Sequence, residues 1–398
     1  MSFVADQVPI WPVPADWGKP VRETLGWLTD QMVAPTFGIS QKRALRQAPR
    51  RGFAFDVIAE GRERRLLDTL RVDAGARQWR LPIWPDGQVL AEAVSAGGDE
   101  LACLTAGYDF VAGGEAVLWR AIDLWEVVAI ATVGETSLVL DGVLASSWPA
   151  GTRLWPLRRA RMLGAADESV WHDDASRMPL QFRIDEPCDW PAVLPAETYR
   201  DLPVLGIRPD YRGGLGGDFT RLVQAVDNET GLVTEYDTVG LPVRHQDHLW
   251  RLFGRAEQAV FRSLAYGLQG RFGNLWVPSW NADLSLAAPI GASDSTISVD
   301  WCGYSLFAHE QEGRRDICIE LAGGAKFLRR ITDSVSAGGT ETLTIDAALG
   351  ETVAPAAVRA ISFVTLSQMA SDQVEIEHVT DADGFAQSRT QWEAVRDV

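Results

Sequence analysis

The chain has 398 residues, of which 46% are hydrophobic and 23% charged, with 36 Gly, 20 Pro and 16 Trp. This composition is typical of a turn-rich globular protein with two to four compact units, and it excludes a disordered chain. A formal net charge of −17 opposes attraction to phosphate backbones and anionic lipids. We therefore expect no sequence-specific binding to nucleic acid and no binding to a membrane.

The amino-terminal segment 1–18 has no basic region followed by an apolar run, and no uncharged apolar stretch of 18 residues occurs in the sequence. Neither a secretory signal nor a membrane span is expected, so folding in a cytoplasm is predicted. One basic run, Gln41 to Arg51, interrupts the acidic sequence. A solvated face or a subunit contact explains it better than a nucleic-acid patch.

A first helix is predicted near residues 61–75, where "GRERRLLDTLRVDAG" carries apolar residues at helical spacing. Next comes "WRLPIW", Trp79 to Trp84, whose proline indicates an edge or terminal strand. Alternating segments such as "SLVLD" and "LQFRI" predict further strands between Gly, Asp and Ser turns. The fold expected from these signals is mainly β, or α+β.

The second part of the sequence carries the same signals in the same order. A helix is predicted near residues 254–270, followed by "GNLWVPSW", by the alternating segments "STISVD" and "TLTID", and by a closing strand "QVEIEH". Aligning Glu63 with Glu257 and Leu67 with Phe261 gives one separation of 194 (257−63 and 261−67). Other pairs align at nearby separations: Trp17 with Tyr211, Pro82 with Pro278, Trp84 with Trp280, Leu101 with Ile297, Tyr108 with Tyr304, and Asp141 with Asp346.

These matches predict two tandem homologous halves. Matches that persist over most of each half, with only small changes of register, are hard to obtain by chance. The first repeat is expected over residues 1–190, with an inserted β subdomain at about 86–160. A proline-rich linker is expected over 191–209, because its prolines prevent a regular helix. The second repeat is expected over 210–398, with a β subdomain at about 282–368. Each repeat is predicted to be a β-sandwich or barrel-like unit with one principal helix.

Histidines supply few candidates for a metal or catalytic site. In "HQDH", His245 and His248 are three residues apart in what reads as a loop entering a strand, where they would point to opposite faces. "WHDD", Trp171 to Asp174, and His309–Glu310 place histidine beside carboxylates, but no nucleophile or zinc motif accompanies them. Solvated loop residues explain these segments best, so we predict no catalytic residue and no metal ligand.

Several other motifs also have a structural explanation. "GGLGGDF", Gly213 to Phe219, lacks the strand and helix context of a phosphate-binding loop and predicts a turn before a helix capped by Asp218. Asn228 begins a glycosylation sequon that has no meaning without secretion. Trp84 and Trp280 are expected in packing. Four scattered cysteines predict ordinary, mostly buried thiols and no bound cofactor: Cys103, Cys188, Cys302 and Cys318.

Three segments resemble tail proteins of bacteriophages with long, non-contractile tails: Glu23 to Phe55, Arg208 to Gly240 and Gly254 to Trp280. The resemblance is to a family of tail-tip and baseplate proteins, such as distal tail or hub-like minor tail proteins. It implies a structural virion protein at the tail tip, assembled in the host cytoplasm, with no enzymatic activity and no cofactor.

The resemblance further implies a homo-oligomeric ring or hub, either a trimer or a hexamer. Such a ring would join the tail tube protein to the tip fibre and the receptor-binding proteins. Three copies of a duplicated chain present six similar surfaces, which suits an adapter between sixfold and threefold symmetry. The acidic charge is expected to keep a lumen from binding DNA. Two alternatives stay open: a tail module that binds a bacterial surface glycan through exposed tryptophans, and a cell-wall hydrolase.

Overall fold

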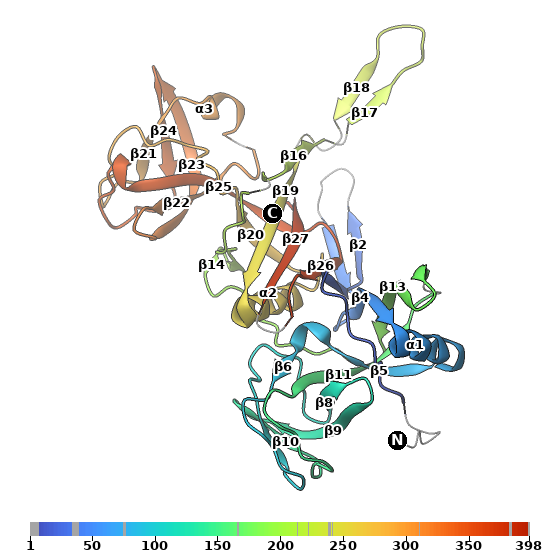
Figure 1. Cartoon of the computed structure of the whole chain (residues 1–398). Coiled ribbons are helices and arrows are strands. Elements are labelled where there is room, and N and C mark those ends of the chain that lie inside the picture. Colours follow the sequence, from blue (N-terminus) through green and yellow to red (C-terminus); the bar gives the residue numbers. More distant parts are fainter. Residues whose placement is uncertain are drawn as a thin grey trace.

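The computed structural model describes residues 8–33, 40–74, 77–164, 167–212, 214–221, 223–237, 240, 242–309, 311–381 and 384–396. Strands dominate these residues and form one large antiparallel sheet system with three small separate hairpins (Figure 1). The prediction of a mainly β protein is confirmed. No helix among the described residues is long and apolar enough to cross a membrane.

The first half, up to residue 190, begins with a short strand, a hairpin, a long strand and a helix: β1 (Val21–Gly26), β2 (Thr29–Val33), β3 (Ser40–Ala44), β4 (Arg50–Glu60) and α1 (Gly61–Ala74). It continues with β5 (Gln78–Pro82), the 3-10 turn η1 (Trp84–Asp86), β6 (Gln88–Val89), β7 (Glu100–Ala102), β8 (Glu115–Ala121), β9 (Leu124–Val133), β10 (Ser137–Leu140), β11 (Arg153–Met162), β12 (Ser169–His172) and β13 (Ala175–Ile184).

The second half begins with the short strands β14 (Thr198–Tyr199) and β15 (Leu202–Pro203), followed by β16 (Gly217–Thr220), β17 (Val223–Val226), β18 (Thr234–Asp237), β19 (Val243–Phe253) and α2 (Gly254–Leu268). It continues with β20 (Asn274–Pro278), β21 (Thr296–Asp300), α3 (Tyr304–Phe307), β22 (Asp316–Leu321), β23 (Lys326–Ala337), β24 (Thr340–Ile345), η2 (Pro355–Ala357), β25 (Val358–Met369), β26 (Gln373–His378) and β27 (Phe385–Ala394).

Strand pairings in the two halves follow one order. β1 pairs with β4 around the β2–β3 hairpin, and β16 pairs with β19 around the β17–β18 hairpin. β4 pairs with β13, and β19 with β27. β11 pairs with β5, β8 and β13, whereas β25 pairs with β20, β22 and β27. These strands therefore pair in the same order along both parts of the chain.

Each half also carries a small β unit, formed by β7 to β10 in the first half and by β21 to β24 in the second. These two units lie at opposite ends of the molecule, and the β17–β18 hairpin projects away from its body (Figure 1). Each unit has its own hydrophobic core. The main cores lie under α1 and α2. The described residues therefore form four large cores, and a smaller fifth cluster surrounds Trp276.

The two halves share one continuous run of eight strands, in the order β16–β19–β27–β26–β1–β4–β13–β12. β1 of the first half lies between β4 and β26, and it is this β1–β26 pairing that joins the halves. Among the described residues, β16 pairs only with β19, and β12 only with β13. Both ends of the eight-strand run are therefore open edges.

Two long strands, β4 and β19, lead directly into the two helices. Alternation in β4 buries Phe53, Phe55 and Val57 on one face, as expected for a strand that covers a core. The helices begin at Gly61 (φ 52°) and Gly254 (φ 72°). A positive φ suits glycine, and it lets the chain turn from strand to helix without an intervening loop.

The segment between the halves packs on the second half. Val204 and Leu205 are buried, and Trp276 Nε1 donates a hydrogen bond of 2.8 Å to the Tyr199 carbonyl oxygen. The described part of residues 185–209 contains no helix. Its short strands and buried residues fix it against β20.

Both predicted strands "LQFRI" and "QVEIEH" are present, in β13 and β26. β26 pairs with β27 as β12 pairs with β13. No strand was predicted from the sequence at β27. Its buried face consists of Ala386, Ser388, Thr390 and Trp392, and three small or polar side chains conceal the hydrophobic alternation that identifies strands.

Candidate functional site at the junction of the halves

The two halves meet at buried charged side chains centred on Glu23 in β1. Glu23 accepts hydrogen bonds of 2.6 Å from Arg51 Nε in β4 and of 2.6 Å from Arg262 Nη2 in α2. His378 Nε2 in β26 lies 2.9 Å from the same carboxylate. Alternation along β1 turns Glu23 to the core face, where it is 0% exposed. One carboxylate therefore links a strand of the first half to a helix and a strand of the second.

Two further carboxylates extend this network. Asp109 pairs with Arg51 and, at 2.5 Å, with Arg158 Nη2 in β11. Asp86 accepts a hydrogen bond of 2.7 Å from Arg255 Nη1 in α2. We call the following residues the junction cluster: Glu23, Arg51, Asp86, Asp109, Arg158, Arg255, Arg262 and His378.

Protonation in the junction cluster follows from burial and charge. Burial alone would raise the pKa of Glu23, but Arg262 and Arg51 outweigh it and hold that pKa well below its usual range. Burial lowers the pKa of His378 despite the nearby Glu23, so its imidazole is neutral. A carboxylate held ionised between guanidinium groups is a poor proton acceptor at neutral pH. The cluster is suited to fixing geometry between the halves.

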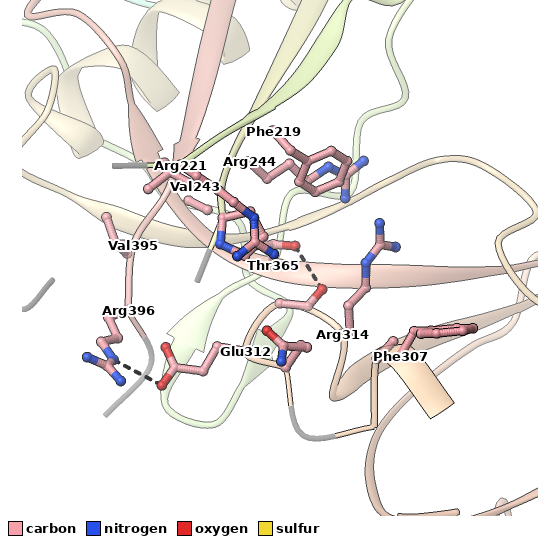
Figure 2. Close-up of a pocket in the computed structure, with 15 residues that line it drawn as sticks. Phe219, Arg221, Val243, Arg244, Phe307, Glu312, Arg314, Thr365, Val395 and Arg396 are labelled. Atoms are coloured by element: carbon pink, nitrogen blue, oxygen red, sulfur yellow. Dashed lines mark hydrogen bonds and ion pairs between the residues drawn. The ribbon is translucent and has the colours of Figure 1, made fainter. Parts of the chain in front are cut away.

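A cavity of about 420 Å³ opens beside the free β16 edge. Figure 2 shows its lining, which comes from β16, the start of β19, the segment after α3, and the chain end after β27. Its principal side chains are aromatic and basic: Phe219, Phe307, Arg221, Arg244, Arg314 and Arg396.

Arg244 is the least satisfied of these basic groups. Its Nη1 atom is buried and has no hydrogen-bond partner among the described residues. Burial and, secondly, Arg314 lower its pKa. Arg314 lies over the Phe219 ring at 5.4 Å, while Arg221 is paired with Asp237 at 2.8 Å. The cavity therefore presents an aromatic surface beside a buried cation, a combination suited to an acidic group carried on an apolar surface.

The two histidines of "HQDH" do not form a metal site. Both lie within β19 rather than in a loop before it, so that part of the prediction is wrong. His248 is 0% exposed and stacks on Trp250 at 4.2 Å. His245 points to the opposite face, as predicted, with its Nε2 3.1 Å from Thr220 Oγ1. The part of the chain that the structure describes holds no group of three or more His, Cys, Asp or Glu able to bind a metal.

His172 and His309 lie apart from the junction cluster. His172 ends β12 and is exposed, with Nδ1 3.6 Å from Asp173. His309 Nε2 lies 3.8 Å from Asp333, and Glu310 is outside the described residues. Among the described residues, each of these histidines therefore lies near a carboxylate.

Trp84 and Trp280 are buried, at 3% and 5% exposure, as the packing interpretation predicted. Trp84 meets Trp155 edge to face at 5.3 Å, and Arg208 lies over the Trp280 ring at 5.0 Å. The tryptophans with large exposed fractions are Trp171 at 54% and Trp301 at 51%. These two are the candidates for any glycan contact.

The prediction of a helix capped by Asp218 is wrong. Residues Gly217–Thr220 form β16, and Gly217 lies opposite Gln246 of β19. A Cβ atom at position 217 would lie 3.2 Å from the His245 carbonyl oxygen, so glycine permits the close approach of the strands. Pairing with β19 overrides the local signal for a helix. Gly213 lies outside the described residues, and Asn228 lies in the β17–β18 loop.

The basic run 41–51 is not a uniformly solvated face. Lys42 Nζ donates a hydrogen bond of 2.5 Å to Asn274 Oδ1, which connects the two halves. Arg51 is buried in the junction cluster, so the solvated interpretation is wrong for that residue.

The four cysteines differ in exposure: Cys188 and Cys318 are buried, Cys103 is half-buried and Cys302 is exposed.

Sequence reasoning did not identify the junction cluster. Its contacts join residues 239 positions apart (Glu23 and Arg262) and 355 positions apart (Glu23 and His378). A charged residue at a core-facing position of a strand is the one signal that could have marked Glu23. Comparison with known proteins does not identify the cluster either. No protein-family model matches the chain, and a search of curated proteins finds no significant match.

Proposed function

We propose that the chain is a structural protein of a bacteriophage tail tip or baseplate. In this proposal its copies form a ring or hub that joins the tail tube to the tip fibre and the receptor-binding proteins. The observation that carries the proposal is the run of eight strands, in which two similar four-strand units are joined edge to edge and both outer edges stay open. Exposed edge strands are usually blunted or covered in monomeric proteins.

The proposal includes a duplication within the chain. Supporting it, β16, β19, β27 and β26 pair in the same order as β1, β4, β13 and β12. The aligned pairs Trp84 and Trp280 are both buried, as are Tyr108 and Tyr304. Repeated units allow one kind of contact to be used both within a chain and between chains. Three copies then present six similar units, which suits an adapter between sixfold and threefold symmetry.

The charge on the open face of the sheet does not follow the acidic balance of the whole chain. Opposite the helices, the described parts of the eight strands carry arginines and carboxylates in nearly equal number: Arg22, Arg50, Arg177, Arg183, Arg251 and Arg389, against Asp56, Glu60, Asp218, Asp247, Glu375, Glu377 and Glu393. If this face lines the ring, the lumen is close to neutral. Repulsion of DNA by an acidic lumen is therefore no part of the proposal.

The mass of the purified full chain tests the proposal. Native mass spectrometry and light scattering at micromolar concentration are expected to give three times the chain mass, and electron micrographs are expected to show rings with a central hole. Six times the chain mass would keep the ring but reject the symmetry adapter. A monomer at every concentration would overturn the proposed function.

A further inference from the structure

The contact between the two halves of one chain supplies a template for a contact between two copies of the chain. β1 pairs with β26, and its Leu25 is buried among side chains of the second-half core. Trp27, which follows β1, packs edge to face on Tyr266 of α2 with ring centroids 5.6 Å apart. The edge of the first half is thereby covered by both a strand and a helix of the second.

β16 occupies the place in the second half that β1 occupies in the first. Leu25 lies opposite Arg51 of β4, and Phe219 lies opposite Arg244 of β19. Arg51 and Arg244 each precede the first glycine of the following helix by ten positions (61−51 and 254−244). Leu25 is 0% exposed, whereas Phe219 is 53% exposed. The position that is covered on β1 is therefore uncovered on β16.

The opposite edge shows the same difference. β12 corresponds to β26, but all four residues of β12 are exposed, whereas alternate residues of β26 are buried. Within the helices the buried Leu67 and Phe261 align at 194, one more than the separation of the helix glycines (254−61 is 193). At 194, Val72 of α1 aligns with Tyr266 of α2 (266−72), and Val72 is 91% exposed. The helix face that receives Trp27 in the second half thus has an uncovered counterpart in the first.

One charged side chain near each open edge is opposite in sign to one near the other edge. Within the chain, Arg262 of α2 reaches Glu23 on β1. The residue of α1 that aligns with Arg262 is Asp68 (262−68 is again 194), whose side chain is 42% exposed and lies 3.7 Å and 3.8 Å from arginines of its own helix. At the β16 edge, the buried Nη1 of Arg244 has no partner among the described residues. A carboxylate on one edge thus matches a cation on the other.

We propose that the β16 edge of one chain, with the cavity beside it, binds the β12 edge and α1 of a second copy, as β1 binds β26 and α2 within the chain. This inference rests on the proposed ring and names the surfaces that join its copies. The pairing would satisfy the open backbone groups of both edge strands. Because each copy presents two different surfaces, repeated contacts related by rotation close a ring.

The eight-strand run determines the width of such a ring. With strands about 4.8 Å apart and tilted by about 40°, three copies of eight strands would close into a tube with a backbone diameter of roughly 50 Å. A closed sheet of that size encloses an open channel, and its face opposite the helices would line it.

Cross-linking tests the strand contact directly. By analogy with the β1–β26 register, Asp218 of one copy and Ser169 of the next are diagonal neighbours, with Cβ atoms about 7–8 Å apart. The variant combines Asp218→Cys and Ser169→Cys with Cys302→Ser, and it is treated with a short bismaleimide. Covalent dimers and a closed trimer are expected on denaturing gels, with little above the trimer.

A matched control uses the same diagonal within the chain. Thr24→Cys with Glu377→Cys, in the Cys302→Ser background, is expected to cross-link without a change in chain number. This result shows that the reagent spans such a diagonal. If the control pair reacts while the Asp218 and Ser169 pair yields monomers from an oligomeric protein, the ring has another joint and the inference is wrong.

A second variant tests the apolar part of the surface without cross-linking. Phe219→Asp is expected to reduce the population of oligomer at least tenfold at a fixed concentration, measured by light scattering. Val335→Asp, at a residue 59% exposed in β23, is expected to leave the oligomer intact. An unchanged oligomer for Phe219→Asp overturns the inference but not the proposed function, whereas a monomeric parent protein overturns both.

Discussion

Glu23 and His378 are 355 positions apart in the sequence, yet Nε2 of the histidine lies 2.9 Å from the Glu23 carboxylate. The contact places the beginning and the end of the chain on adjacent strands of one sheet. Both side chains are buried, and the same carboxylate accepts hydrogen bonds from Arg51 and Arg262. The two halves are therefore expected to depend on each other for stability, although each has its own core.

Replacing Glu23 with Gln tests this dependence. The substitution keeps the shape of the side chain but leaves the buried guanidinium groups of Arg51 and Arg262 without their shared carboxylate. Removing one partner of a buried ion pair costs about 3–5 kcal/mol, and we expect a loss of that size in the free energy of unfolding. Urea denaturation monitored by tryptophan fluorescence measures it.

The matched control is Arg22→Gln, the neighbouring residue on the opposite face of β1. Arg22 is 58% exposed and lies 3.5 Å from Glu377. Exposed pairs of this kind contribute about 0–1 kcal/mol. Equal losses for Glu23→Gln and Arg22→Gln would contradict a special role of the junction cluster.

His248 gives a prediction about pH. Burial lowers its pKa from 6.5 to about 3. Between these two pH values the imidazole is therefore protonated in the unfolded chain and neutral in the folded chain. Stability therefore falls as the pH falls below 6.5, by about 2 kcal/mol between pH 7 and pH 5. His248→Phe should remove this part of the pH dependence in denaturation curves recorded across that range.

Phenylalanine is a reasonable replacement because both ring nitrogens of His248 are buried without hydrogen-bond partners among the described residues. The corresponding position of β4, six before the first glycine of the helix, holds Phe55 (254−248 and 61−55 are both 6). His245→Phe, on the other face of β19, serves as the control and should keep the slope. If His248→Phe keeps the full slope as well, other groups cause the acid sensitivity.

The two long helices, α1 and α2, could be predicted from sequence because the spacing of their apolar residues reflects burial directly, whereas the four-residue α3 was not predicted. Phe261, Leu264 and Leu268 have the predicted apolar spacing and are 1–3% exposed. β16 could not be predicted, since Gly217 and Asp218 favour a turn locally and only pairing with β19 makes the segment extended. The junction cluster also required the structure, because nothing local distinguishes the buried Arg51 from the other basic residues of its run.

The cysteines give a prediction about chemical reactivity. Burial and a hydrogen bond to Glu341 raise the pKa of Cys302, but this thiol is exposed to solvent. Burial raises the pKa of Cys103 to about 11 and that of Cys318 to about 12, and neither of these thiols is exposed. The thiolate is the reactive form, so one rapid labelling event with a maleimide is expected in the native protein. Intact mass spectrometry counts the labels, and Cys302→Ser should abolish the rapid event. Rapid labelling of Cys318 would show that its environment opens readily.

Gly270 supports the contact between the halves at the end of α2. It adopts φ 69°, and a Cβ atom there would lie 2.8 Å from Cα of Asp372. The Asp372 carboxylate accepts hydrogen bonds from the backbone N–H and the hydroxyl of Thr29 in β2, at 2.7 Å and 2.8 Å. Gly270→Ala must therefore displace a residue that holds the first half.

We expect Gly270→Ala to lower the free energy of unfolding by about 2–5 kcal/mol, because a left-handed conformation costs about 1–2 kcal/mol and overpacking about 1–3 kcal/mol more. Gly338→Ala separates the two effects. Gly338 has a similar φ of 65° but no atom within 4 Å of the added Cβ, so only the conformational cost of about 1–2 kcal/mol applies. Urea denaturation of both variants measures the difference. Equal losses of stability would mean that Asp372 moves aside freely. The close approach of Gly270 to Asp372 would then not help to hold the halves together.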